Sequence, residues 1–411
     1  MSRNNTKRLS RSGLYLLCVV AMLFTQTPAW ALVTETLKLV PEDPQIGSFF
    51  GQQVAIGGGA ALVASPEADS TGAAYVFDTN TGTQLFKLTP DDLFAGDQFS
   101  GGAMTIANGR AYIGGGRDLT GTSVIWIFDL TSGLQVGKLT PEDVDATTTF
   151  GSEIAIHGNT AIIGATTTDV GGFEGAGSAY LFDIPTGNQI AKLTSDTPMQ
   201  FGSFGNSVAI DASYAAVNAG GSNQVYLFDS LTGLPIADFP GPSISAAGDS
   251  LALNGDRLLL GTANISPGDD GVRLYDISDP LDVTFDTLSW PQPGPGLFFG
   301  KSVALSNSAM LVSTWFSDDI NASGIVHMFN PDTGDLLDSF RSSDAAVDDV
   351  FGQSIGLDGQ TLIVGAPGEP TTTGAAYLFT IPEPTTIFII FATGLTLVGR
   401  RHKQLQSANV R

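Results

Sequence analysis

Cysteine and histidine are almost missing from this chain of 411 residues. The only cysteine is Cys18, near the N-terminus, so the body of the protein has no disulfide, thiolate metal site or cysteine nucleophile. The body contains two histidines, His157 and His327, which lack the spacing of metal ligands. The Gly-x-Ser-x-Gly sequence at 352–356 belongs to a segment that recurs along the chain, and no phosphate-binding loop motif occurs. We therefore expect a protein without catalytic activity, cofactor or metal site.

Basic residues are also scarce, with 18 Lys and Arg against 41 Asp and Glu. Eight of the basic residues lie in the two end segments, while every acid except Glu383 lies between those segments. Such an acidic body repels phosphate backbones, which excludes nucleic acid as a partner.

Glycine and hydrophobic residues are plentiful, with 50 Gly, 25 Phe and 42% hydrophobic residues overall. The glycines indicate many tight turns, and the apolar residues are sufficient for a packed core. Together they favour a folded all-β domain.

The N-terminal segment, residues 1–31, has the layout of a secretory signal peptide. Basic residues precede an apolar run at 14–24, and Ala29-Trp30-Ala31 has the small-x-small pattern of a cleavage site, with Ala29 and Ala31 as its small residues. A retained membrane anchor is the alternative, although about 20 apolar residues are needed to span a bilayer.

The C-terminal segment, residues 381–404, is a second candidate address. Pro382-Glu383-Pro384 precedes a predicted hydrophobic helix at 386–399 and a basic stretch containing Arg400 and Arg401. This order resembles the PEP-CTERM sorting signal of Gram-negative bacteria. The resemblance implies transient contact with the inner membrane, processing by a protease or transpeptidase of the exosortase type, and delivery to the cell surface or the extracellular space. An ordinary C-terminal anchor is the alternative, and residues 405–411 are expected to be a disordered tail.

Between these ends, over residues 32–380, one unit recurs seven times at spacings of 43 to 54 residues. Each unit begins with an apolar strand, continues through a second and third, and ends in a fourth that reads Lys-Leu-Thr-Pro in the clearest copies. This is the length of one four-stranded blade of a β-propeller. The unit starts are Phe50-Gly51, Ser100-Gly101, Phe150-Gly151, Phe204-Gly205, Ala247-Gly248, Phe299-Gly300 and Phe351-Gly352.

Turn chemistry divides each unit into hairpins. Asn108-Gly109, Asn254-Gly255 and Asp358-Gly359 are expected to supply the positive φ angles of type I′ turns in the first hairpin. Asp-to-Gly spacings of four residues mark the second hairpin, where the Asp caps the turn. They begin at Asp78, Asp129, Asp183 and Asp229.

The seventh unit lacks a fourth strand before the C-terminal segment. Residues 35–40 contain Leu37-Lys38-Leu39, which matches the fourth-strand endings of other units. We predict that this stretch completes the last blade and closes the ring.

These units resemble the FG-GAP repeat of the integrin α-subunit propeller and of many bacterial surface proteins. Phe351-Gly352-Gln353-Ser354-Ile355 followed by Val364-Gly365-Ala366-Pro367 carries the likeness best. The resemblance implies a seven-bladed propeller and a role in adhesion or recognition. Integrin-type repeats bind calcium through a D-x-D-x-D-G loop, which this chain lacks, so those sites are not expected here.

A ligand surface is expected where the loops between second and third strands meet the links between units, because these are the variable parts. The links are acidic, and their candidate residues for a cation or ligand face are Asp91, Asp92, Glu142, Asp143, Asp348 and Asp349. Trp315 is a candidate ring for stacking on a sugar. The alternative is a solvated rim that binds nothing.

Three functions stay open at this point. The first is an exported, non-enzymatic adhesion or matrix protein that binds extracellular polysaccharide or another surface protein. The second is a propeller enzyme of the quinoprotein type, which usually has a docking tryptophan in each blade. The third is a purely structural surface scaffold.

Overall fold

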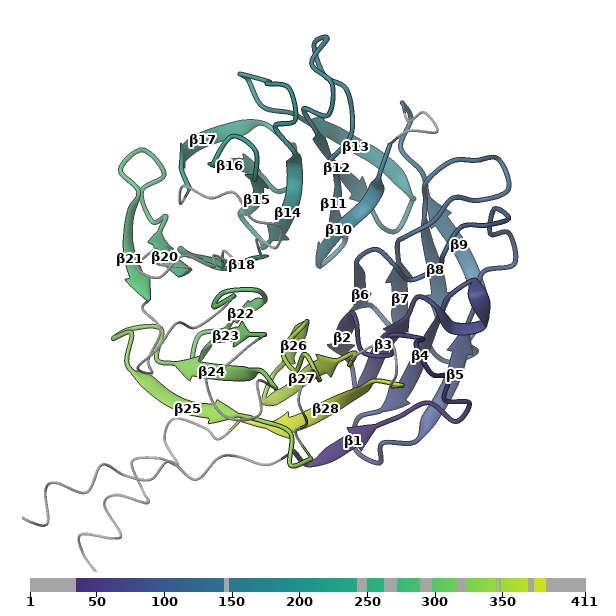
Figure 1. Ribbon diagram of the computed structural model, residues 1–411. Helices are drawn as coiled ribbons and strands as arrows, with labels where there is room; N and C mark the ends of the chain where they lie inside the picture. Colours follow the sequence, from purple (N-terminus) through teal and green to yellow (C-terminus); the bar gives the residue numbers. More distant parts are fainter. Residues whose placement is uncertain are drawn as a thin grey trace, which may run out of the picture.

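The computed structural model describes residues 35–143, 148–241, 250–261, 272–288, 298–315, 323–344, 346, 349–368 and 373–381. Over these residues, 28 strands form seven antiparallel sheets of four strands each. The sheets are arranged as blades around a central axis (Figure 1). The predicted all-β fold, the seven blades and the four strands of each blade are confirmed.

The strands are described by blade, from the innermost strand outward. Blades 1 to 3 are β2 (Val54–Gly57), β3 (Ala60–Ser65), β4 (Ala73–Asp78), β5 (Gln84–Leu88); β6 (Met104–Ala107), β7 (Arg110–Ile113), β8 (Ile125–Asp129), β9 (Gln135–Leu139); and β10 (Phe150–His157), β11 (Thr160–Ala165), β12 (Ser178–Asp183), β13 (Asn188–Leu193). Blades 4 and 5 are β14 (Phe204–Ile210), β15 (Tyr214–Ala219), β16 (Gln224–Asp229), β17 (Pro235–Pro240); and β18 (Ser250–Asn254), β19 (Arg257–Gly261), β20 (Val272–Asp276), β21 (Thr284–Leu288). Blades 6 and 7 are β22 (Val303–Leu305), β23 (Met310–Thr314), β24 (Ile325–Phe329), β25 (Leu336–Phe340); and β26 (Ile355–Asp358), β27 (Thr361–Ala366), β28 (Ala375–Thr380), β1 (Leu37–Leu39).

The phenylalanine that begins each clear unit anchors its blade from within. Phe50 packs edge-on against Tyr75 and Phe77 of β4, with ring centroids 5.5 and 5.9 Å apart. Phe150 and Phe351 make the same pair of contacts with the third strands of blades 3 and 7. Because such pairs contribute beyond their buried area, the repeated Phe-Gly specifies how the first strand packs on the third.

The glycine after that phenylalanine is required where two blades meet. Gly51 has φ +98°, and a Cβ there would collide with the carbonyl oxygen of Ala375 in blade 7.

Blade 2 departs from the predicted alignment at this position. Phe99 contacts Trp126 and Phe128 as Phe50 contacts its partners, and Ser100 has a positive φ of 65°. The equivalent pair is therefore Phe99-Ser100, so the predicted start at Ser100-Gly101 is one residue late. The predicted start at Ala247-Gly248 lies outside the described residues.

The second hairpins form as predicted. The Asp78 carboxylate accepts a hydrogen bond of 2.8 Å from the Thr81 backbone N–H, and Gly82 has φ +70°. Asp129, Asp183 and Asp229 make equivalent bonds. These aspartates therefore serve the turns.

The first hairpins confirm the prediction only in part. Asn108 and Gly109 both have positive φ, as a type I′ turn requires. Asn254 and Asp358 instead pair as the last residues of their strands, and only the glycine after each has positive φ. For these two hairpins the predicted type I′ turn is wrong, because the loop begins one residue later.

The ring closes through its first strand, as predicted. β1 pairs antiparallel with β28 in the register Leu37 with Leu378, Lys38 with Tyr377 and Leu39 with Ala376. Leu39 is fully buried. Blade 7 thus contains strands from both ends of the body (Figure 1).

Within the described ranges, no helix is both long enough and apolar enough to cross a membrane. The hydrophobic helix expected at 386–399 lies outside these residues.

Candidate functional site

The predicted acidic face brings links and loops together. Lys87, in the fourth strand of blade 1, forms ion pairs with Asp43 in the preceding link and with Asp69 in the loop after β3. Because one side chain reaches both segments, the links and the loops between second and third strands share a face of the ring, which we call the variable face.

Asp92 belongs to a structural contact on this face. Its carboxylate accepts hydrogen bonds from the Lys138 ammonium at 2.6 Å and from Trp126 Nε1 at 2.9 Å. Lys138 also pairs with Asp118 at 2.5 Å, and the Asp118 side chain is only 8% exposed. Burial raises the pKa of Asp92, but the hydrogen bonds from Lys138, Trp126 and Gln135 outweigh it and lower the pKa overall.

The same contact recurs at four blade interfaces. In each, a fourth-strand lysine reaches an acid in the link that precedes its blade, and we call this contact the lysine clasp. The pairs are Lys38 with Asp344, Lys87 with Asp43, Lys138 with Asp92 and Lys192 with Asp143. Asp143, predicted as a ligand residue, is thus bound to Lys192 at 2.5 Å.

Two of the predicted acids keep exposed side chains. The backbone N–H groups of Asp91 and Glu142 donate to the side-chain oxygens of Gln135 and Gln189, at 3.2 and 3.1 Å. Both residues are exposed. Among the described residues, no three His, Cys, Asp or Glu side chains are grouped so that they could hold a metal ion.

Trp315 is half-buried and already has two neighbours. The Lys301 ammonium lies 4.6 Å from its ring centroid, and the Phe298 ring lies 5.1 Å away. Asp349 accepts a hydrogen bond of 2.6 Å from the Ala346 N–H within its own turn. The remaining predicted residues lie outside the described residues: Ala29, Ala31, Asp348, Pro382, Glu383, Pro384, Arg400 and Arg401.

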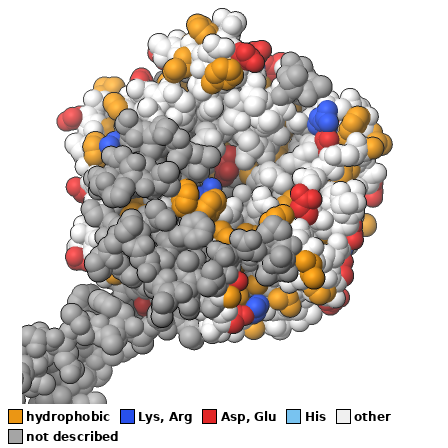
Figure 2. Space-filling model, viewed as in Figure 1, with side chains coloured by type: hydrophobic (Ala, Val, Ile, Leu, Met, Phe, Trp, Pro, Cys, Tyr) orange, Lys and Arg blue, Asp and Glu red, His pale blue; other side chains and the backbone are white. Residues whose placement is uncertain are grey.

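A second candidate site, which the sequence analysis missed, lies on the axis of the ring. The first strands of the blades surround a cavity of about 460 Å³. Figure 2 shows a hollow at the centre of the ring with acidic and basic side chains in it. Glu153 is the one acid and Lys301 the one base among the described residues that line this cavity.

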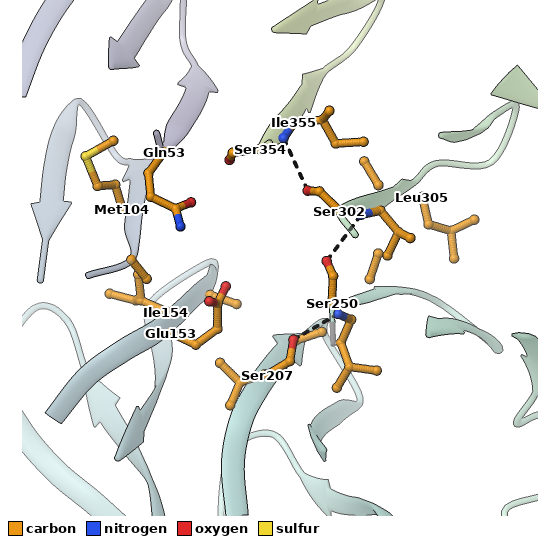
Figure 3. Close-up of a pocket in the computed structure, with 18 of the residues that line it drawn as sticks. Gln53, Met104, Glu153, Ile154, Ser207, Ser250, Ser302, Leu305, Ser354 and Ile355 are labelled. Carbon is orange, nitrogen blue, oxygen red and sulfur yellow. Dashed lines mark hydrogen bonds between the residues drawn. The ribbon is translucent and has the colours of Figure 1, made fainter. Parts of the chain in front are cut away.

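Serine hydroxyls link the first strands over part of the ring. In each case the serine Oγ accepts a hydrogen bond from a backbone N–H in the next blade (Figure 3). The pairs are Ser207 with Leu251 at 2.9 Å, and Ser250 with Val303, Ser302 with Ile355 and Ser354 with Val54, each at 3.2 Å. We call this series the serine chain, and it runs from blade 4 through blade 7 to blade 1.

Three blades have another residue at the serine position. Gln53 and Glu153 occupy it in blades 1 and 3, and both side chains point into the cavity (Figure 3). In blade 2 Ala103 occupies this position. Its carbonyl accepts a hydrogen bond from the Gly114 N–H, just as the Gln53 carbonyl accepts one from the Ala64 N–H in blade 1. The cavity wall is therefore asymmetric, with serines on one side and a carboxamide and a carboxylate on the other.

Glu153 supplies the negative charge among the described residues of the cavity lining. Burial raises its pKa to about 7, although the Lys301 charge acts in the opposite direction. Among the described residues, its carboxylate has no hydrogen-bond partner. The sequence contains one sign of this site. The fourth residue of the Phe-Gly-x-x unit is serine in several copies, whereas it is glutamate at position 153.

Comparison with known proteins supports the repeat assignment. Residues 33–77, 134–182 and 339–379 match the family model of the FG-GAP repeat. No curated protein matches the chain. A similar solved chain comes from the structure titled "Crystal Structure of Mitotic Checkpoint Complex", with 11% identity, coverage of 93% of this chain and 97% of that one, and a TM-score of 0.57.

At that identity the structural likeness shows the fold alone. The predicted resemblance to FG-GAP repeats is confirmed for the three matched segments. Such repeats in a β-propeller are consistent with a surface binding or adhesion protein.

Proposed function

We propose that this protein is an exported, non-enzymatic binding protein of the cell surface or extracellular matrix. Its partner is an extracellular polysaccharide or another surface protein. The observation that carries the proposal is the match of FG-GAP repeats to blades of a closed seven-bladed ring.

The construction of the variable face supports a binding role. Lysine clasps hold four of its links against neighbouring blades, so the loops lie on a rigid frame. The carboxylates of Asp91 and Glu142 remain exposed on that frame. Binding residues commonly lie on loops that a rigid scaffold positions.

Export and sorting rest on the two ends of the sequence. Mass spectrometry of the intact protein recovered outside the cell tests them directly. Loss of residues 1–31 and of the segment after Pro382 is the expected result. A full-length C-terminus found in the membrane fraction would contradict sorting through that segment.

Binding is tested with the protein released by its own cells. It should sediment with, or be retained by, the extracellular polysaccharide or the surface of those cells. Retention should weaken as salt increases, because the exposed groups are charged. No retention on either material would contradict the proposed function.

A different assay distinguishes an enzymatic role from the proposed binding role. Pyrroloquinoline quinone with a dye acceptor should give no turnover. Trp126 supports this expectation, since it occupies a third-strand position that is tyrosine in blades 1, 3, 4 and 7, and its Nε1 donates a hydrogen bond to Asp92.

A further inference from the structure

The central cavity has the size and access of a binding site for a small molecule. Its volume of about 460 Å³ lies within the range of small-molecule sites, roughly 300–1,000 Å³. Its polar side chains belong to the start of the first strands, which directly follow the links. The polar end of the cavity therefore opens towards the variable face.

Polar side chains of this end flank blade 2 on both sides. Gln53 and Glu153 point into the cavity from blades 1 and 3 (Figure 3). Between them blade 2 contributes Ala103, which has a small apolar side chain. Gln353 lines the cavity beside Gln53, on the side of blade 7. The cavity lining thus combines one carboxylate with the carboxamides of Gln53, Asn206 and Gln353.

Glu153 is the one group among the described lining residues that attracts a cation. Lys301 is the one basic residue among its described lining residues, and the ammonium of Lys301 lies over the Trp315 ring at 4.6 Å. No described residue donates a hydrogen bond to Glu153. A carboxylate withdrawn from water is stabilised by a proton or by a bound cation. The carboxamides of Gln53 and Gln353 can both donate and accept, which suits hydroxyl groups.

We propose that the central cavity binds an amino-sugar unit with a free amine, whose ammonium contacts Glu153 and whose hydroxyls contact Gln53 and Gln353. The unit is the end of a glycan chain that enters from the variable face. This inference rests on the proposed binding of polysaccharide and names the sugar that is recognised.

Three monosaccharides test the recognition of the amine, because they differ only at one carbon. Glucosamine, glucose and N-acetylglucosamine are titrated into the purified full-length protein at neutral pH, with binding followed by ligand-observed NMR. A charge-assisted hydrogen bond predicts that glucosamine binds about tenfold more tightly than either neutral sugar. Equal affinity of the three sugars, or no binding of glucosamine, would overturn the proposal.

Two variants locate the contact. Glu153→Gln removes the charge with little change of shape and should abolish the preference for glucosamine. Asp286→Asn removes a charge from an exposed position on the outermost strand of blade 5 and should leave the preference intact. A preference that survives in Glu153→Gln, or that disappears in Asp286→Asn, would place the amine elsewhere and overturn the proposal.

The intact polysaccharide distinguishes this inference from the proposed function. If Glu153→Gln binds the polymer as tightly as the unchanged protein does, the cavity site is wrong and the proposed function stands. If the unchanged protein binds neither polymer nor surface protein, the proposed function itself is wrong.

Discussion

Glu153→Gln should stabilise the protein at alkaline pH but have little effect in acid. The folded pKa of Glu153 is about 7, raised mainly by burial from an ordinary value of 4.5. The folded state therefore binds the proton more tightly than the unfolded state does. The stability contributed by that proton is fully present below pH 4.5 and is lost as the pH rises to 7.

The size of the effect follows from the pKa difference. One pKa unit corresponds to about 1.4 kcal/mol, so the loss across this window is up to about 3 kcal/mol. The glutamine side chain of the variant has no proton to lose, so the variant should avoid this loss. The other acids titrate alike in both proteins, so their effects cancel in the comparison.

Urea unfolding of both proteins at pH 5 and at pH 8.5 measures the difference. The free energy of unfolding of the variant relative to the unchanged protein should rise between these two pH values. Glu142→Gln, at an exposed position, should show no such rise. A difference for Glu153→Gln that does not change with pH would refute the half-buried, unpaired state of this carboxylate.

Three further changes test the closure and the blade interfaces. Leu39→Ala should cost about 2–5 kcal/mol in denaturant unfolding, because Leu39 is fully buried, whereas Val40→Ala at a half-exposed position should change stability by about 0.5 kcal/mol or less. Lys138→Met should lower the free energy of unfolding by about 2 kcal/mol, because it leaves the 8% exposed Asp118 without its cation. Lys87→Met should lower it by less than about 1 kcal/mol, because the partners of Lys87 are about half exposed. The Lys138 effect should be fully present above pH 3.8 and should decline as the pH falls from 3.8 towards the lowered folded pKa values of its partner acids. Gly51→Ala should cost about 3 kcal/mol or more, measured as a lower thermal midpoint, because the positive φ and the Ala375 carbonyl both oppose a Cβ.

The repeats made the architecture predictable, because each copy contains its own strand and turn signals. The closure by Leu37–Leu39 could be predicted for the same reason, since its sequence matches the other fourth strands. The blade 2 alignment failed because an extra residue between Ser100 and Ala103 shifts the register, and only the contacts of Phe99 reveal it.

The site was harder to predict because it depends on contacts between units. Asp92 and Asp143 look like free acids in the sequence, whereas their lysine partners lie 46 and 49 residues away, in the next repeat. Glu153 differs from the serines at its position by one residue type, and its direction into the cavity follows only once the ring is assembled. The sequence therefore predicted an acidic face but not which acids are already neutralised.

The pairing of β1 with β28 also determines how the molecule would be presented on a surface. Because the two strands are antiparallel, the start of β1 near Thr36 and the end of β28 near Ile381 lie side by side. The Thr36 backbone N–H donates a hydrogen bond to the Leu378 carbonyl. In a blade of alternating strands, this point lies on the side of the ring opposite the links. A tether through the C-terminal segment would therefore hold the propeller with its variable loops and the polar mouth of its cavity directed outward, away from the point of attachment.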